Sequence, residues 1–235
     1  MRQEDARIAL SESKLIALLP AKARDDFVAK CKVRRYEPRE RMMAIGDLII
    51  GPCWMESGLA RIHLPWGDGR DYPIGFFWPG SILVTSLADR EEWETEVRAV
   101  SPVTLVSIPR AVFRDLALRE AGLSLAFLSA VSEGLRWRQH WEARLRAVPL
   151  RPRLLSILGR AADELGTPTS EGILLDFPFT QGALSFGTIT SRDETARAMR
   201  DLEGWGYYQR RPRHRILIPD RDRLRTYVIQ QSEEA

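Results

Sequence analysis

The sequence predicts an α+β protein with a β-rich N-terminal region, one long helix and a helical C-terminal region that includes a short β-hairpin. Three observations support this fold class. Short β-favouring runs separated by turn signals occupy residues 33–108. Apolar residues then recur at helical spacing along residues 122–147. Beyond them, residues 180–218 contain two capped helical segments, followed by glycines, two short strands and an arginine-rich connection.

The composition is that of a globular protein with enough residues for two domains. The chain has 235 residues, 44% of them hydrophobic, and a formal net charge of +3. With so small a net charge, any surface that binds nucleic acid must be local. No apolar run is long enough to span a membrane, and the start MRQEDAR does not resemble a signal peptide. We therefore expect a cytoplasmic protein without membrane association.

The sequence contains no set of residues that predicts catalysis or metal binding. Cys31 and Cys53 lack the spacing of metal ligands, and in the cytoplasm we expect two buried or half-buried thiols rather than a disulfide. An enzyme built on a jelly roll would need clustered His and Glu ligands, but the β-rich region offers only His63. No nucleophile–base pair or phosphate-cradling glycine loop stands out. We predict that the protein is not an enzyme and has no catalytic residues and no metal site.

The β-rich region follows a short amphipathic segment at residues 11–31, in which Pro20 is expected to start a second helix. Gly-Asp-Gly at residues 67–69 predicts a tight hairpin turn. Eight short strands at this spacing predict a barrel, roll or jelly roll. The runs are KVRRYE, RMMAIG, CWMESG, ARIHL, RDYPIGFF, SILVTSL, TEVRAV and VTLVSI.

A short helix over residues 111–116 and a long helix over residues 122–147 follow. The long helix has a seam at steps of three and four, which is apolar at first and polar later. Its length favours pairing with a second copy of the chain, although a helix that covers its own sheet would give a similar pattern. We expect Trp137 and Trp141 to pack on the β-rich region. The candidate dimer-interface residues are Leu128, Val131, Leu135, Arg138 and Leu145.

Prolines mark the boundary after the long helix. Pro149 and Pro152 cannot continue it, so we expect a hinge near 147–152. The predicted domains are residues 1–149 and 150–235. The second domain is expected to contain a helix over 153–165, a loop over 167–171, a strand-like run over 173–179, a short helix over 220–227 and frayed residues at 231–235.

Two helical segments separated by a tight turn lie at the centre of the second domain. Thr180 is a suitable N-cap for the first, and Ser191 caps the second with Glu194 at the capping-box position. The first helix is expected to break at residues 187–190, where glycine and β-branched residues weaken it. The second helix has an apolar face at steps of three and four, formed by Thr195, Ala198, Met199 and Leu202. This layout is that of a helix-turn-helix.

The opposite face of the second helix presents charged residues near its start. An arginine at position 192 or 197 could donate two hydrogen bonds to guanine, and Asp193 could accept one from cytosine or orient Arg197. On a lone helix, such charges would more often be solvated. Here a basic hairpin follows: strands are expected at Tyr207–Tyr208 and Ile216–Ile218, joined by an arginine-rich connection. That connection is typical of a wing that neutralises phosphates.

The run SRDETARAMRDLEGWGYY resembles the recognition helix and wing entry of the cyclic-AMP receptor/fumarate-nitrate regulator (CRP/FNR) superfamily. The family's base-reading residues correspond to Arg192, Asp193 and Arg197. Three positions depart from the family: Asp193 is one methylene shorter than the usual Glu, Glu194 stands where Thr is common, and Ile189 stands where the turn has Gly. The candidate DNA-contact residues are Thr180, Ser191, Arg192, Asp193, Arg197, Arg200, Arg210, Arg211 and Arg213.

The β-rich region is similar to the β-roll sensor domain of the same superfamily, in ESGLARI, the GDGR hairpin, FWPG and VRA. The resemblance implies a cyclic-nucleotide-binding-like domain, but the phosphate-binding arginine is not found. Trp93, flanked by acids, stands near its place, which argues against a cyclic nucleotide. The N-terminal cysteine cluster of iron–sulfur members is also missing. His63, His140 and His214 are more often core or surface residues than haem ligands. Trp54, Trp66, Trp78 and Trp93 form either an apolar effector cavity or, more commonly, core.

The resemblance implies a bacterial transcription regulator that binds a palindromic DNA site as a homodimer and responds to an unidentified effector. No cofactor is predicted. The expected partners are double-stranded DNA and a second copy of the chain, with RNA polymerase and a small-molecule effector as candidates. The alternative is an effector-binding or protein-interaction module without DNA function. Loss of DNA binding in a folded, dimeric Arg197→Ala variant would distinguish the two.

Overall fold

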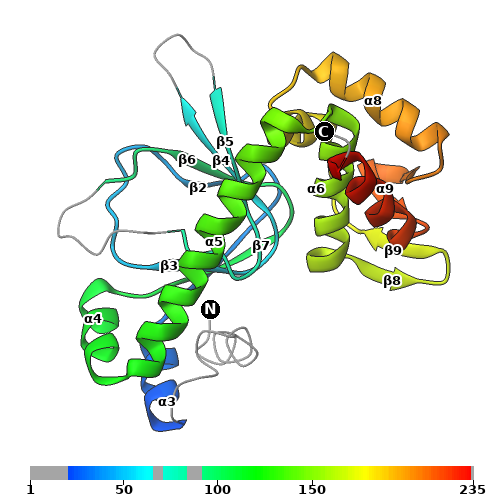
Figure 1. Cartoon of the computed structure of the whole chain (residues 1–235). Coiled ribbons are helices and arrows are strands. Elements are labelled where there is room, and N and C mark those ends of the chain that lie inside the picture. Colours follow the sequence, from blue (N-terminus) through cyan, green and yellow to red (C-terminus); the bar gives the residue numbers. More distant parts are fainter. Residues whose placement is uncertain (1–20, 66–70, 84–91, 234–235) are drawn as a thin grey trace. The chain divides into compact units, whose positions relative to one another are not determined.

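The computed structural model describes residues 21–65, 71–83 and 92–233 (Figure 1). The chain forms two compact units. The first comprises Met1–Tyr72 and Phe76–Trp137, and the second comprises Pro73–Gly75 and Arg138–Ala235. The units therefore divide inside the long helix, whereas the sequence predicts the domain boundary after it, at 149–150.

Two antiparallel β-sheets form the β-roll of the first unit. The strand order is β1-β7-β3 in one sheet and β2-β6-β4-β5 in the other. In the first sheet Val106 of β7 stands opposite both Val33 of β1 and Trp54 of β3. The elements are α3 (Ala21–Lys30), β1 (Lys32–Tyr36), β2 (Arg41–Met43), β3 (Cys53–Ser57), β4 (Ala60–Pro65), β5 (Asp71–Phe77), β6 (Glu96–Ala99), β7 (Val103–Ser107), α4 (Arg110–Arg119) and α5 (Ala121–Ala147).

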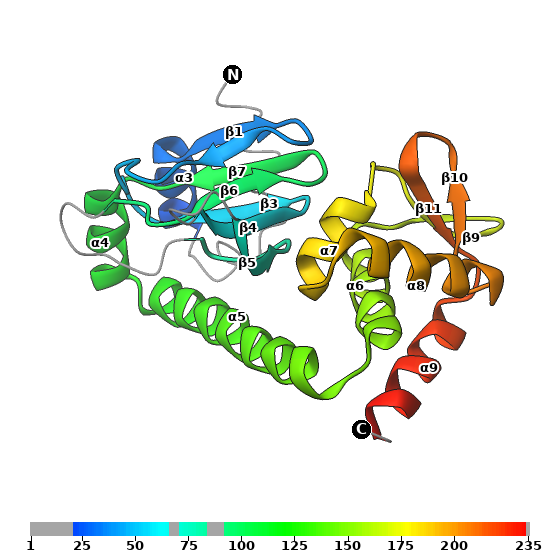
Figure 2. The same ribbon diagram turned by 90° about the horizontal axis from the view of Figure 1, so that it is seen from above.

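Apolar side chains of α3, α4 and the start of α5 cover one face of the β1-β7-β3 sheet. Phe27, Trp54, Phe113 and Leu123 belong to this core cluster, and each is at most 4% exposed. Figure 2 shows the helices beside the strands. The helix predicted to start after Pro20 is therefore α3, while the rest of the amphipathic segment at 11–31 lies partly outside the described residues.

Seven of the eight predicted strands are present. The exception is the run from Ser81 to Leu87: its described part makes only an isolated bridge, between Trp54 and Ile82, and the run continues outside the described residues. The predicted hairpin turn at 67–69 also lies outside them.

The two cysteines are free as predicted, with Cys53 buried and Cys31 half-buried. Burial raises the pKa of Cys31 to about 12 and that of Cys53 to about 11, so both thiols stay protonated near neutral pH.

The tryptophans of the β-roll are part of its core. Trp54, Trp78 and Trp93 are 4%, 1% and 8% exposed, and Trp66 lies outside the described residues. Trp78 packs edge-on against Trp137 of α5, with ring centroids 6.2 Å apart. The prediction that Trp137 packs on the β-rich region is therefore confirmed.

The second unit contains the remaining helices around a four-stranded sheet of order β10-β11-β9-β8. Leu154, Leu155 and Leu158 of its first helix are fully buried, and that helix packs against the last one. The elements are α6 (Leu150–Leu165), β8 (Thr167–Thr169), β9 (Gly172–Leu175), α7 (Gln181–Thr188), α8 (Arg192–Gly204), β10 (Gln209–Arg211), the 3₁₀ turn Pro212–His214, β11 (Arg215–Ile218) and α9 (Arg221–Glu233).

Several element boundaries in this unit differ from the predictions. Residues 167–171 are not a loop, because Thr167–Thr169 pairs with Gly172–Leu175 as a hairpin. The helix predicted from residue 153 starts at Leu150, with Pro149 as its N-cap and Pro152 still in its first turn, where proline is tolerated. The last helix continues to Glu233, because Leu224 and Val228 are buried, so residues 231–233 are helical rather than frayed.

The predicted strand Tyr207–Tyr208 is wrong, since β10 begins at Gln209. The Tyr207 N–H donates to the Leu202 carbonyl and the Gly206 N–H to the Glu203 carbonyl, which closes the end of α8. The Tyr207 N–H is therefore not available to a sheet. Tyr208 is fully buried, and its hydroxyl donates to the Met199 carbonyl over 2.8 Å.

Candidate nucleic-acid interface

The first helix of the predicted helix-turn-helix is α7, and its start and end follow from local chemistry. The Thr180 hydroxyl accepts from the Ala183 N–H over 3.2 Å, as expected of an N-cap. After Thr188 the chain turns at Ile189, which has a left-handed backbone with φ 53°. This is the position where the resembling family has glycine. A β-branched residue is strained in this conformation, so Ile189 makes the turn less stable than glycine would.

The second helix, α8, begins at a complete capping box. The Glu194 N–H donates to Ser191 Oγ over 3.2 Å, and Glu194 Oε2 accepts from the Ser191 N–H over 3.3 Å and from Ser191 Oγ over 2.9 Å. These hydrogen bonds lower the pKa of the Glu194 carboxyl. Because its carboxylate accepts these hydrogen bonds, Glu194 stabilises the N-terminus of α8.

Three threonine hydroxyls join the two helices across the turn. Thr188 Oγ1 is 2.8 Å from Thr190 Oγ1, which is 3.0 Å from Thr195 Oγ1. Thr188 also donates to the Leu184 carbonyl over 2.9 Å. Both Thr188 and Thr195 are fully buried. The predicted inward face of α8 is confirmed, since Thr195, Ala198, Met199 and Leu202 are all buried.

The outward face of α8 is a ridge formed by Asp193, Arg197, Arg200 and Gly204. Their spacing of four, three and four residues places them along one line of the helix. All four are exposed, and Arg192 is exposed on the neighbouring flank. Among the described residues, Arg192, Arg197 and Arg200 have no carboxylate within ion-pair distance. Asp193 therefore does not hold the Arg197 guanidinium in an ion pair, and these arginines have no carboxylate partner among the described residues.

The wing arginines differ from those of the ridge, because most of them are paired with acids of the same unit. Arg210 Nε is 3.0 Å from Glu203, and Arg215 Nη1 is 2.8 Å from Asp176. Arg211 pairs with Glu171 of the β8–β9 turn. Arg210 and Arg211 also lie in β10 rather than in the connection, which is a correction to the predicted tip. The tip is Pro212–His214.

Arg213 is the wing arginine without such a partner. It has a left-handed backbone with φ 61°, and the next residue, His214, has φ 59°. Both residues are exposed at the connection between β10 and β11, two strands that Figure 2 shows side by side. Of the three predicted wing contacts, Arg213 alone has no carboxylate partner within the described part of the chain.

Two side chains that the sequence does not single out for this role hold the turn between α7 and α8. Trp141 was expected on the β-rich region, but it is buried in the second unit, where its indole N–H donates to the Gly187 carbonyl over 3.2 Å. Arg153 Nη1 donates to the Thr188 carbonyl over 3.1 Å and to the Leu145 carbonyl over 3.2 Å. Both contacts satisfy carbonyls at a helix end.

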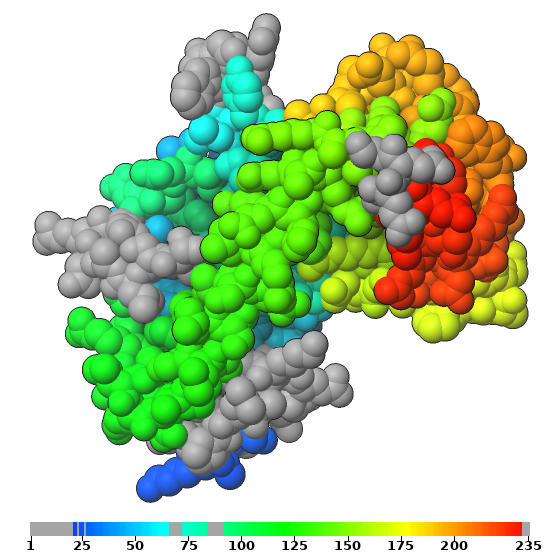
Figure 3. All heavy atoms as spheres, viewed as in Figure 1, coloured from blue at the N-terminus to red at the C-terminus, as the bar shows by residue number. Residues whose placement is uncertain are grey.

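The candidate dimer face of α5 has exposed leucines. Leu128 and Leu135 are 62% and 55% exposed, while Val131 and Leu145 are half-buried and Arg138 is exposed. Leu125, which is not among the candidate interface residues, is 64% exposed and lies one turn before Leu128. The exposed line runs through Leu125, Leu128 and Leu135. In Figure 3 the green spheres of α5 form a ridge on the viewed face.

The β-roll residues weighed as effector ligands lie mostly within packed or paired surroundings. His63 is 1% exposed, and its Nε2 lies 3.4 Å from Glu96 Oε1 on the neighbouring strand. Trp93 is buried, and its backbone N–H donates to the Asp47 carbonyl over 2.9 Å.

Within the described ranges, no three His, Cys, Asp or Glu side chains gather as metal ligands would. None of the helices described is long and apolar enough to cross a membrane.

The fold and the interface together define a class: a β-roll joined by a long helix to a winged helix-turn-helix. No model of a known protein family matches the sequence, and no curated protein has significant sequence similarity to it. Several solved structures that match this chain are described as transcriptional regulators of the CRP or CRP/FNR family. CooA from Carboxydothermus hydrogenoformans is 16% identical with a TM-score of 0.64, and the match covers 94% of each chain.

Two further structures match with higher TM-scores. FixK2 from Bradyrhizobium japonicum is 14% identical with a TM-score of 0.69, over 83% of this chain and 96% of its own. TTHB099 from Thermus thermophilus, described as a transcriptional regulator of the CRP family, is 20% identical with a TM-score of 0.67, over 86% of this chain and 100% of its own. The chain therefore has the fold of the CRP/FNR superfamily, and the predicted fold class is confirmed.

Proposed function

We propose that this protein is a CRP/FNR-type transcription regulator that reads double-stranded DNA with α8. The observation that carries the proposal is the ridge of α8, where Arg197 and Arg200 are exposed and have no ion-pair partner among the described residues. Free guanidinium groups on the outward face of a capped helix suit bidentate hydrogen bonds to guanine. Arg192 and Asp193, in the first turn, complete the proposed base-reading set.

Phosphate contacts are proposed from the elements around that helix. Thr180 and Ser191 stand at the starts of α7 and α8, where backbone N–H groups and hydroxyls suit phosphate oxygens. Arg213 at the wing tip would add a cation beside the groove. Arg210 and Arg211 would contribute only if binding opened their pairs with Glu203 and Glu171.

The regulator would act as a homodimer through α5. Exposed leucines one or two turns apart, at 125, 128 and 135, form an apolar stripe of the kind that pairs helices. A two-fold dimer presents two recognition helices about 34 Å apart, so the preferred site would be palindromic. RNA polymerase is a further proposed partner, because a regulator acts on transcription.

The effector is proposed to be something other than a cyclic nucleotide, or to be absent. Trp93 stands near the place where the resembling sensor domains have their phosphate-binding arginine, and it is buried. The Trp78 and Trp137 rings pack edge-on against each other. These side chains provide no cation for a cyclic phosphate.

The test is selection from a random duplex pool by the purified protein, with and without cyclic nucleotides, at a stated salt concentration. The proposal expects one two-fold symmetric motif, enriched equally in both arms. Arg197→Ala should reduce affinity for that motif by about 1–3 kcal/mol and relax one position of it.

Arg225→Ala, at an exposed arginine of α9, is the matched control and should bind like the parent. If Arg197→Ala binds every duplex as the parent does while staying folded and dimeric, base reading by α8 is excluded. The module without DNA function would then be the better interpretation.

A further inference from the structure

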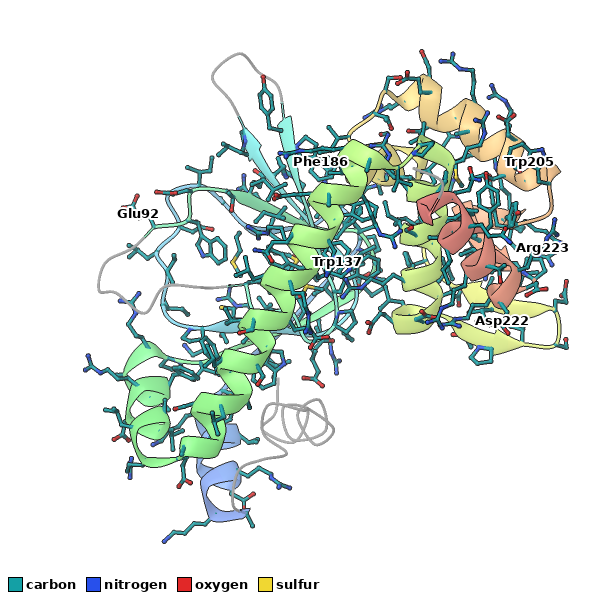
Figure 4. All side chains as sticks on the ribbon, in the orientation of Figure 1. Glu92, Trp137, Phe186, Trp205, Asp222 and Arg223 are labelled. Atoms are coloured by element: carbon teal, nitrogen blue, oxygen red, sulfur yellow. The ribbon has the colours of Figure 1, made fainter. Side chains whose placement is uncertain are left out.

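A second exposed surface of the winged unit combines tryptophan, tyrosine and arginine where α6, α8 and α9 meet. Trp205, the residue after α8, is 45% exposed. Arg151 at the start of α6 lies over its ring, with 5.5 Å between Cζ and the ring centroid. Arg223 of α9 donates from Nη2 to the Trp205 carbonyl over 2.9 Å. Figure 4 shows Trp205 and Arg223 near the C-terminal end of α8.

The side chains of this surface are held in place before any partner binds. Arg223 stacks on Tyr207, with 4.7 Å between Cζ and the ring centroid, and Tyr207 packs on Tyr227 at 5.0 Å. Arg151 Nε donates to Asp201 Oδ2 over 3.1 Å. We call Arg151, Trp205, Tyr207, Arg223 and Tyr227 the Trp205 surface. Because these side chains are already ordered, binding a partner costs less conformational entropy.

The Trp205 surface and the wing lie on opposite flanks of α8. Glu203 pairs with Arg210 of the wing, and Asp201 pairs with Arg151 of the Trp205 surface. Two residues apart on an α-helix are separated by about 200° around its axis. A duplex that contacts the outward ridge and the wing would therefore leave the Trp205 surface open.

The chemistry of the Trp205 surface suits an acidic partner. Asp201 is already paired with Arg151, and Asp222 is 3.7 Å from Arg221 and lies apart in Figure 4. The Arg223 backbone N–H donates to Asp220 Oδ1 over 2.9 Å. Within the described residues the Arg223 guanidinium has no carboxylate within ion-pair distance, so its remaining N–H groups can take one from outside. An exposed indole beside a free guanidinium fits a carboxylate next to an apolar side chain. Trp, Tyr and Arg are also the residues that dominate binding energy at protein interfaces.

We propose that the Trp205 surface binds an acidic segment of a partner protein. A carboxylate of that segment pairs with Arg223, and a neighbouring apolar side chain packs on Trp205. The proposal goes beyond DNA reading and does not depend on it, because the surface is formed whether or not α8 contacts a duplex.

The test uses the full chain and a displayed library of random twelve-residue peptides, selected in the absence of DNA. The expected result is enrichment of peptides with Asp or Glu next to an apolar residue. A synthetic copy of one such peptide should bind Trp205→Ala and Arg223→Glu at least about tenfold more weakly than the parent. Arg225→Glu carries the same charge change two positions further along α9, on its other flank, and should bind normally.

Several results would overturn the proposal. They are enrichment without an acidic pattern, no enrichment, or equal peptide binding by the parent and Arg223→Glu. Loss of duplex binding by Arg223→Glu with retained folding would instead assign the surface to nucleic acid. Urea unfolding checks the fold of both variants; since Arg223 is exposed, Arg223→Glu keeps the test decisive even if Trp205→Ala is destabilised.

Discussion

The indole N–H of Trp141 donates a hydrogen bond to the backbone carbonyl of Gly187 across 3.2 Å, which ties the end of α5 to the last turn of α7. Trp137, one turn earlier on the same helix, packs on Trp78 of the β-roll unit instead. Trp137 and Trp141, one turn apart on α5, therefore make their contacts within different units. The Gly187 carbonyl belongs to the group of helix-end acceptors that lack an intrahelical donor, so the indole supplies what the helix cannot.

Trp141→Phe should loosen the turn between α7 and α8. The change removes the donor and leaves a buried carbonyl unsatisfied, at a cost of about 1–3 kcal/mol. Faster hydrogen exchange is expected at the Ile189 and Thr190 amides. Trp137→Phe is the matched control and should leave these amides unchanged. Equal exchange in Trp141→Phe and the parent would mean that the hydrogen bond contributes nothing to the turn.

Ile189→Gly should stabilise the winged unit. Ile189 has φ 53° and a side chain that is 53% exposed, so its removal relieves backbone strain and loses little burial. The left-handed conformation costs a β-branched residue about 1–2 kcal/mol, while glycine costs the unfolded chain roughly 0.5–1 kcal/mol. A net gain of a few tenths to about 1 kcal/mol is expected in urea unfolding. Ile189→Ala, which keeps part of the strain, should fall between the two, and a destabilised glycine variant would contradict the strain argument.

The Ser191–Glu194 cap should make stability fall in acid. Hydrogen bonds from Ser191 lower the pKa of Glu194 below its ordinary value of 4.5. The folded state therefore holds the charged form more strongly than the unfolded state does. This contribution is fully present above about pH 4.5 and is lost as the pH falls through the lowered pKa. Urea midpoints between about pH 6 and 3 should decline more steeply for the parent than for Glu194→Gln, and parallel curves would exclude the cap as a cause.

The salt dependence of DNA binding should separate Arg213 from Arg211. Arg213 has no acid partner among the described residues, whereas Arg211 pairs with Glu171. Loss of one phosphate contact lowers the slope of log K against log salt by about 0.9. Arg213→Ala should show this change, and Arg211→Ala should keep the parent slope. A lower slope in Arg211→Ala would mean that its ion pair opens on DNA.

Leu128→Glu and Leu135→Glu should yield monomers that bind the selected palindrome weakly. Both leucines are more than half exposed on α5, so a carboxylate costs the free chain little but opposes pairing of two helices. Sedimentation equilibrium gives the oligomeric state. Leu118→Glu is the control, because Leu118 is 82% exposed on α4, off the proposed seam. Dimers of undiminished stability in both α5 variants would move the interface elsewhere.

Local signals predicted most of the helix-turn-helix correctly. Thr180, Ser191 and Glu194 cap helices with hydrogen bonds that reach only three residues along the chain, so their role is readable from spacing. The inward face of α8 follows from its apolar period. Local sequence patterns were wrong where a backbone group bonds outside the predicted element. Tyr207 has the residue type of a strand, but its backbone N–H donates to the Leu202 carbonyl and closes the end of α8.

The sequence by itself determined the strand-rich and helical regions, the caps, the long helix and the resemblance that predicted the fold class, because these depend on residue types at short, regular separations. Only the tertiary structure decided which charges are free and which are paired. Arg210 and Arg211 look like Arg213 in the sequence, yet acids 7 and 40 residues away pair with the first two. The same holds for Trp141 and Gly187, 46 residues apart. Contacts of that separation depend on how the chain folds back on itself, and no spacing rule encodes them.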